Sequence, residues 1–98
     1  MKILAITACP TGIAHTYMAA ESLERAGRKL GHAIKVETQG AMGIENRLTE
    51  EDIREADVLL LASDLPVQGR DRFPDSLRIL EVPVQLAIRN PADIFSRL

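Results

Sequence analysis

Cys9 is the only cysteine of the 98-residue chain, and the residues around it suit nucleophilic chemistry. An apolar run over residues 2–8 precedes it and predicts a strand that is buried on both faces. A helical pattern begins near Thr16, so the thiol falls at a strand-to-helix turn, where open α/β folds bind ligands. Backbone N–H groups at such a turn can converge on an anion, and a thiolate there can attack phosphorus or carbon. We therefore expect Cys9 to be reactive rather than an inert buried side chain.

The segment after Cys9 has the features of an anion-binding loop. With Cys9 as the nucleophile, the candidate phosphate-binding residues are Pro10, Thr11, Gly12, Ile13, Ala14, His15 and Thr16. Gly12 can adopt the positive φ that such a loop needs, and Pro10 stiffens the turn. Thr16 lies where its hydroxyl could both cap the helix and bind a ligand. N–H groups clustered ahead of a helix also favour the thiolate form of a cysteine.

The spacing Cys-x5-His-Thr is similar to Cys-x5-Arg-[Ser/Thr], the phosphate loop of low-molecular-weight tyrosine phosphatases and arsenate reductases. His15 stands where those enzymes have arginine. An arginine fork binds two phosphate oxygens in the transition state of hydrolysis, whereas a histidine offers at most one well-aimed donor. The loop therefore favours accepting and passing on a phosphoryl group over hydrolysis. A single cysteine also disfavours a reductase, which needs a resolving thiol. A direct contact of His15 with phosphate and a purely capping role both stay open.

Composition excludes several classes of protein. The chain is 46% hydrophobic and 27% charged with a net charge of −2, which is typical of one globular domain. It has no basic stripe with interleaved aromatics, so nucleic acid is not an expected partner. Its one cysteine and two histidines form no recognisable zinc pattern, so no metal is expected. No apolar run could cross a bilayer or serve as a signal peptide, so we expect a cytoplasmic location.

The order of elements predicts an α/β fold. Strands are expected over residues 2–8, 33–39, 58–62 and 77–82, and helices over 16–30, after Thr49, after Pro83 and after Asn90. Residues 33–39 alternate, which predicts a half-exposed edge strand with Lys35, Glu37 and Gln39 on one face. Residues 40–43 are predicted as a loop, and 64–76 as a loop that can hold one helical turn.

These elements predict one open-sheet domain over residues 1–98. Its four parallel strands take the order 2-1-3-4, with helices on both faces. The topological switch point then lies beside Cys9. Gln39 and Gly40 follow the second strand and Asp64 follows the third, so they are candidate supporting residues. Asp64 could be a general acid or only a turn former.

Residues 5–16, Ala-x-Thr-Ala-Cys-Pro-Thr-Gly-Ile-Ala-His-Thr, closely resemble the B domain (enzyme IIB, EIIB) of the fructose-type bacterial phosphoenolpyruvate-dependent sugar phosphotransferase system, PTS. Segments 17–21, 36–40, 43–46 and 52–53 are also similar to that family. The resemblance is strong over residues 3–63. Beyond them, Arg72-Phe73 is similar to a family pair, but Pro74-Asp75 replaces an expected Gly-Lys.

The resemblance implies a phosphoryl relay. Cys9 would accept the phosphoryl group from a phosphohistidine of the EIIA component and pass it to fructose or a related hexose in the membrane EIIC component. The loop Pro10–Thr16 would be the cradle, with no cofactor and no membrane insertion of this chain. The chain would sit at the inner face of the plasma membrane through EIIC, and segment 64–82 would tune which partner docks. A cysteine-dependent phosphatase or arsenate reductase, and an orphan regulatory docking module, stay open as alternatives.

Overall fold

A five-stranded sheet with the order β3-β2-β1-β4-β5 organises the chain. This computed structural model describes residues 1–10 and 13–98. The strands are β1 Lys2–Ala8, β2 Ala33–Gly40, β3 Gly43–Glu45, β4 Val58–Ser63 and β5 Arg78–Val82. β1 is parallel to β2 and β4, β4 is parallel to β5, and the short β3 is antiparallel to β2. The central place of β1 explains its run of apolar residues, since both of its faces are covered.

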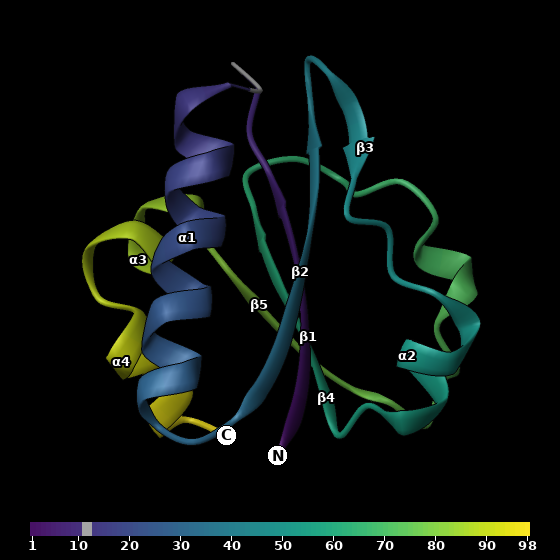
Figure 1. The fold of residues 1–98 in the computed structure, drawn as a ribbon. Coiled ribbons are helices and arrows are strands. Elements are labelled where there is room, and N and C mark those ends of the chain that lie inside the picture. The colour runs from purple at the N-terminus through teal and green to yellow at the C-terminus, as the bar shows by residue number, and fades with distance from the viewer. Residues whose placement is uncertain (11–12) are drawn as a thin grey trace.

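Helices cover both faces of the sheet, as predicted. They are α1 Ala14–Lys29, α2 Glu50–Glu55, α3 Val84–Arg89 and α4 Pro91–Ser96, together with the 3-10 turn η1 Arg70–Arg72. In Figure 1, α1, α3 and α4 lie on one side of the sheet and α2 lies on the other. Thr49 caps α2 through a reciprocal capping box with Asp52, and the side chain of Asn90 caps α4. Both caps were expected from the sequence.

Alternation along β1 divides the core into two layers. Ile3 and Ala5 face α1, where they pack with Leu23, Val36 and other buried residues. Leu4 and Ile6 face the opposite side, in a smaller cluster that is completed by Leu48, Leu59, Leu61 and Phe73. The period of two thus sends consecutive apolar residues of a central strand into different clusters.

The predicted strand order is confirmed for the four parallel strands, but the predicted strand count is one short. Residues 40–43 were expected to form a loop, whereas the chain turns after Gly40 and returns as β3, which pairs Gly43 with Gly40 and Glu45 with Thr38. Gly43 has a φ of +87°, a conformation that a residue with a side chain rarely adopts. A strand of three residues is too short for alternation to reveal it.

The prediction that β2 is a half-exposed edge strand is wrong for the carboxyl-terminal half of the strand. Val36, Glu37, Thr38 and Gln39 are all buried, and β3 lies along the outer side of β2. Alternation did mark opposite faces, but both faces are covered near the carboxyl end of the strand. Glu37 tolerates this burial because it is paired, as described below.

The fold brings the predicted site residues to one edge. The carboxyl end of β1, the start of α1 and the β2–β3 hairpin lie at one end of the molecule, and both termini lie at the other (Figure 1). In parallel sheets this carboxyl edge is where ligands bind.

Candidate functional site

Three strand ends meet at Ala8, the residue before Cys9. Ala8 pairs with Gln39 of β2 on one side and with Ser63 of β4 on the other. The N–H of Asp64 also donates to the carbonyl of Ala8, at 3.3 Å. Cys9 is 8% exposed and follows directly from this junction. The backbone that carries the thiol is therefore fixed from both sides.

Helix α1 begins five residues after Cys9 with an open N-terminus. Its N-cap residue is Ile13, whose side chain makes no capping hydrogen bond, and its first turn has no acidic residue. The expectation that Thr16 caps the helix is wrong, because Thr16 is the third helical residue. The Thr16 side chain is fully buried, and no partner for its Oγ1 exists in the described part of the chain. Such a helix start suits an anion.

A buried hydrogen bond ties this helix start to β1. Thr7 Oγ1 donates to the carbonyl oxygen of Thr16 at 3.0 Å. Thr7 lies two residues before Cys9, so the bond joins the strand and the helix on either side of the loop. Thr38, which pairs with Thr7 in the sheet, has a buried hydroxyl without a hydrogen-bond partner among the described residues.

The other candidate loop residues lie on the surface. Pro10, Ile13, Ala14 and His15 are exposed. Thr11 and Gly12, which were predicted to belong to the same cradle, lie outside the described residues.

Gln39, Gly40 and Asp64 lie at the same edge of the sheet as Cys9. The side chains of Gln39 and Asp64, however, form hydrogen bonds with other residues. Gln39 hydrogen bonds with the backbone of Gln68 and with Glu37. Asp64 Oδ1 accepts a hydrogen bond from the N–H of Val84, the first residue of α3, at 3.2 Å. Gly40 ends β2 and is half-buried.

Glu37 and Arg72 form the most buried ion pair of the described structure, with side chains 0% and 17% exposed. Arg72 donates to both carboxylate oxygens at 3.0 Å, Gln39 Nε2 donates at 2.8 Å and the N–H of Leu48 donates at 2.8 Å. Burial by itself raises the pKa of Glu37, but these hydrogen bonds outweigh it and leave the pKa below its ordinary value. The carboxylate is therefore ionised at neutral pH.

Two further side-chain contacts join elements around the site, β2 to α2 and α1 to β3. Lys35 Nζ lies 2.7 Å from Asp52 Oδ2, and this hydrogen bond, helped by the Thr49 N–H, lowers the pKa of Asp52 to about 2. The Tyr17 hydroxyl donates to Glu45, which joins the first turn of α1 to β3. That hydrogen bond raises the pKa of Tyr17.

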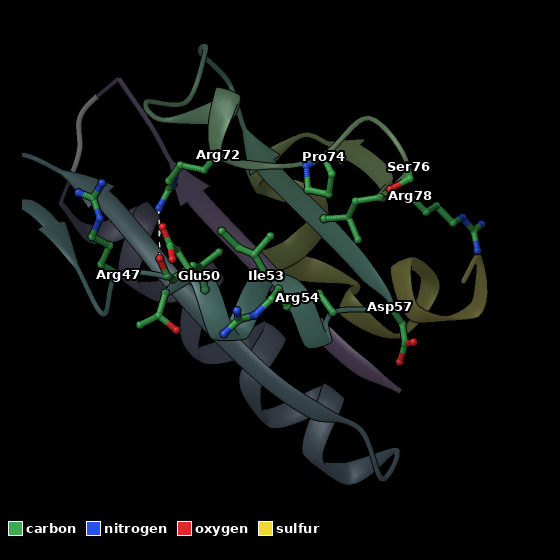
Figure 2. A pocket seen from close by; sticks show the side chains of 13 residues that line it. Arg47, Glu50, Ile53, Arg54, Asp57, Arg72, Pro74, Ser76 and Arg78 are labelled. Atoms are coloured by element: carbon green, nitrogen blue, oxygen red, sulfur yellow. Dashed lines mark hydrogen bonds between the residues drawn. The ribbon is translucent and has the colours of Figure 1, made fainter.

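A groove of about 1060 Å³ lies on the α2 side, between α2 and the segment after η1. Figure 2 shows Arg47 and Arg78 at opposite ends of it, with Ile53 between them. Cys9 and the other described candidate residues do not line it. Arg72 does line it, and through Glu37 it connects this face with β2.

Residues 1–10 and 13–98 contain neither a group of metal ligands nor a membrane-spanning helix. Within them, no three His, Cys, Asp or Glu side chains are grouped as metal ligands would be. None of the helices they form is long and apolar enough to span a membrane.

Sequence reasoning missed the network around Glu37. The alternating pattern assigned Glu37 to solvent, and Arg72 lay in a segment described as a loop. The available signal was the family resemblance of residues 36–40 and of Arg72-Phe73, because these two stretches are the ones that pair.

The family of the chain follows from a comparison with protein-family models. A model described as "PTS system, Lactose/Cellobiose specific IIB subunit" matches residues 4–97. The chain belongs to the PTS IIB family. The match runs almost the whole length of this IIB chain and includes residues 64–97.

Curated relatives place this IIB chain among the fructose-like EIIB components. It is 45% identical over 97 residues to "PTS system fructose-like EIIB component 2" of Escherichia coli K12, covering 99% of the chain and 91% of that protein. It is 50% identical over 99 residues to a "Fructose-like PTS system EIIBC component" of the same organism, of which it spans only 20%. A Bacillus subtilis "PTS system fructose-specific EIIABC component" is 47% identical, with 98% of the chain and 15% of that protein covered.

Solved structures share the fold. A domain of a fructose-specific IIABC component from Borrelia burgdorferi superposes with a TM-score of 0.91 at 46% identity, covering 97% of this chain and 89% of that one. An enzyme IIB subunit from Escherichia coli K12 gives a TM-score of 0.90 at 44% identity, covering 98% and 88%. The IIB chain is thus a component of a sugar-transporting phosphotransferase system.

Proposed function

We propose that Cys9 is the phosphoryl carrier of this IIB chain, receiving the group from a phosphohistidine of an EIIA component and passing it to a sugar held by an EIIC component. The observation that carries the proposal is the start of α1. It is a 16-residue helix whose N-terminus lacks a side-chain cap and an acidic first turn, and it begins just after the thiol. A phosphoryl group on Cys9 would be stabilised by such N–H groups.

Each transfer is an in-line displacement at phosphorus. In the first, the Cys9 thiolate forms an S–P bond while the N–P bond of the phosphohistidine breaks, and the imidazole keeps that electron pair. In the second, a sugar hydroxyl oxygen forms an O–P bond and gives up its proton to water, while the S–P bond breaks and sulfur keeps the electron pair, which restores the thiolate. Such transfers depend mainly on positioning and charge stabilisation, which the loop Pro10–Thr16 would provide.

The buried hydroxyl of Thr16 supports the cradle. A buried hydroxyl without a partner is unfavourable, and among the described residues Thr16 Oγ1 has none, which is consistent with a phosphate ligand that it binds. The hydrogen bond from Thr7 to the Thr16 carbonyl holds the first turn of α1 against β1, the strand that leads to the thiol.

The surface around Cys9 fits a protein partner better than a small substrate. Exposed apolar side chains occur at this edge on three segments: the start of α1, the β2–β3 turn and the loop after β4. They are Ile13, Tyr17, Met18, Met42 and Leu65, from 37% to 76% exposed. Cys9 lines neither the groove beside α2 nor the small pocket around Leu61 and Glu81. An open, partly apolar edge suits docking of another protein's phosphohistidine.

The names of the relatives support the proposed partners and the proposed sugar. Their names join the B component with C, or with A and C, in one chain, so we propose EIIA and EIIC as donor and acceptor partners and a membrane-associated place of work through EIIC. The fructose-like relatives make fructose or a related hexose the proposed sugar. Residues 1–98 would act as one carrier domain.

One experiment separates this proposal from a phosphatase. The chain is incubated with phosphoenolpyruvate, the general phosphorelay proteins and an EIIA component, and its intact mass is recorded over time. A carrier gains one phosphoryl group and turns over no phosphate ester such as p-nitrophenyl phosphate. Steady ester hydrolysis by the chain alone, without loading from EIIA, would favour the phosphatase. EIIC membranes and sugar are then added, and a loaded chain that transfers no phosphoryl group to the sugar would favour the regulatory module.

A further inference from the structure

The segment from Asp64 to Gly69 crosses the end of β1 directly before Cys9. It leaves β4 beside Ala8, because Ser63 pairs with Ala8 in the sheet. It then reaches Gln39, which pairs with Ala8 from the other side. Since neighbouring strands lie about 4.8 Å apart, the chain between Ser63 and Gln68 must span the strand that carries Cys9.

Gln39 holds the far end of this segment through two hydrogen bonds. The N–H of Gln68 donates to Gln39 Oε1 at 2.7 Å, and Gln39 Nε2 donates to the carbonyl of Gln68 at 2.9 Å. The side-chain amide of Gln39 thus pairs with the backbone of Gln68 as a neighbouring strand would. At the near end, the N–H of Asp64 donates to the Ala8 carbonyl.

Glu37 determines which way the Gln39 amide points. Gln39 Nε2 also donates to Glu37 Oε2 at 2.8 Å. An ionised carboxylate only accepts hydrogen bonds, so a flipped amide would place oxygen against oxygen. Arg72 keeps Glu37 in place, and its Nε donates to the Gly69 carbonyl at 2.7 Å, so the same group that fixes Glu37 also closes the turn after Gln68.

We propose that Gln39 is a positioning residue for phosphoryl transfer at Cys9: through Gln68 it holds segment 64–69 against the end of β1 and fixes the backbone from which Cys9 projects. This inference rests on the proposed phosphoryl transfer. In-line attack is sensitive to alignment, and an error of about 1 Å costs on the order of a hundredfold in rate. Loosening the segment should therefore lower the maximal rate of loading and leave the half-saturating concentration of the donor unchanged.

The test compares Gln39→Met with Gln68→Ala. Methionine keeps the length and volume of Gln39 but forms none of the three hydrogen bonds of the Gln39 amide. Gln68→Ala is the matched control, because it removes a side chain and retains the backbone groups that Gln39 binds. Purified phosphorylated EIIA is mixed with each variant over a range of concentrations, and loading of Cys9 is followed by intact mass after quenching. Hydrogen exchange at the Gln68 amide and denaturant unfolding are measured on the same samples.

Positioning predicts that Gln39→Met remains folded, exchanges the Gln68 amide faster and loads Cys9 at a maximal rate lower by about tenfold or more. Gln68→Ala should match the wild type. A Gln39→Met protein with an exposed Gln68 amide and an unchanged maximal rate would overturn the inference, as would a change confined to the half-saturating concentration. Should Gln39→Met fail to fold, Gln39→Asn replaces it, since its polar amide is one methylene too short to reach Gln68. If the wild type does not load at all, both the proposed function and this inference fail. If the wild type and Gln39→Met load at the same maximal rate, only this inference fails.

Discussion

Arg72 donates two parallel hydrogen bonds to the buried carboxylate of Glu37, from Nη1 to Oε1 and from Nη2 to Oε2, each 3.0 Å long. The two residues are 35 positions apart and join the turn η1 to the strand β2. The pair closes the α2 side of the sheet near its carboxyl edge, where an unpaired carboxylate would be costly.

Replacing Arg72 by methionine should lower the free energy of unfolding by about 3–5 kcal/mol, because Glu37 would remain buried without its cation. Arg70→Met is the matched control. Arg70 pairs with Glu81, but both side chains are more than half exposed, so its loss should cost about 0–1 kcal/mol. Urea denaturation of both variants measures the difference. Equal losses would show that the Glu37 pair adds nothing beyond a surface pair.

Stability should fall in acid as Glu37 and Asp52 take up protons. Both carboxyls have a pKa below their ordinary value in the folded chain, to about 2 for Asp52. A lowered folded pKa adds stability above the unfolded pKa, near 4, and that stability is lost as pH falls toward the folded pKa. The urea midpoint of the wild type should therefore decline between about pH 4 and pH 2.

Asp52→Asn should flatten part of this decline, because asparagine carries no charge for Lys35 to stabilise. Glu51→Gln, on the exposed side of the same helix, should show the same pH dependence of the urea midpoint as the wild type. A wild-type midpoint that stays constant down to pH 2 would contradict the assignment of stabilising ion pairs to these carboxylates.

The hydroxyls of Thr7 and Thr38 should respond oppositely to replacement by valine. Thr7→Val removes the bond to the Thr16 carbonyl and should cost about 1 kcal/mol of unfolding free energy, with faster hydrogen exchange in the first turn of α1. Thr38→Val removes a buried hydroxyl that has no partner in the described structure, and should be neutral or stabilising. Thermal unfolding and exchange rates of the two variants check this, and a larger loss for Thr38→Val would refute it.

Gly69 has both a positive φ and a close contact with Arg72, whereas Gly31 has only a positive φ, so comparing the two positions distinguishes the two effects. Gly69 has a φ of +72°, and a Cβ there would lie 2.7 Å from Arg72 Nε. Gly31 has a φ of +83° with open space around it. Gly31→Ala should cost about 1 kcal/mol from backbone strain alone. Gly69→Ala should cost more, because it also displaces Arg72 from Glu37. If the two variants unfold at the same denaturant concentration, the contact with Arg72 is unimportant.

The sequence was sufficient for the parallel strand order and for the place of Cys9, because apolar runs and caps are local signals. It could not reveal the burial of Glu37, since alternation reports the face of a strand and not what covers that face. The partner of Glu37 comes from a loop 35 residues away, and only the folded chain brings Arg72 there. Thr16 was misjudged as a cap because helix starts are uncertain by one or two residues, and the helix begins at Ala14.

The most direct measurement is the location of the phosphoryl group after loading from phosphorylated EIIA. The protein is quenched, digested at a pH that preserves the S–P bond, and its peptides are sequenced by mass spectrometry, with Cys9→Ser treated in parallel. We expect one phosphorylated site, on Cys9, and no phosphorylation of Cys9→Ser. Phosphate on His15 or His32, or loading of the serine variant at the wild-type rate, would contradict the account of Cys9 as the carrier.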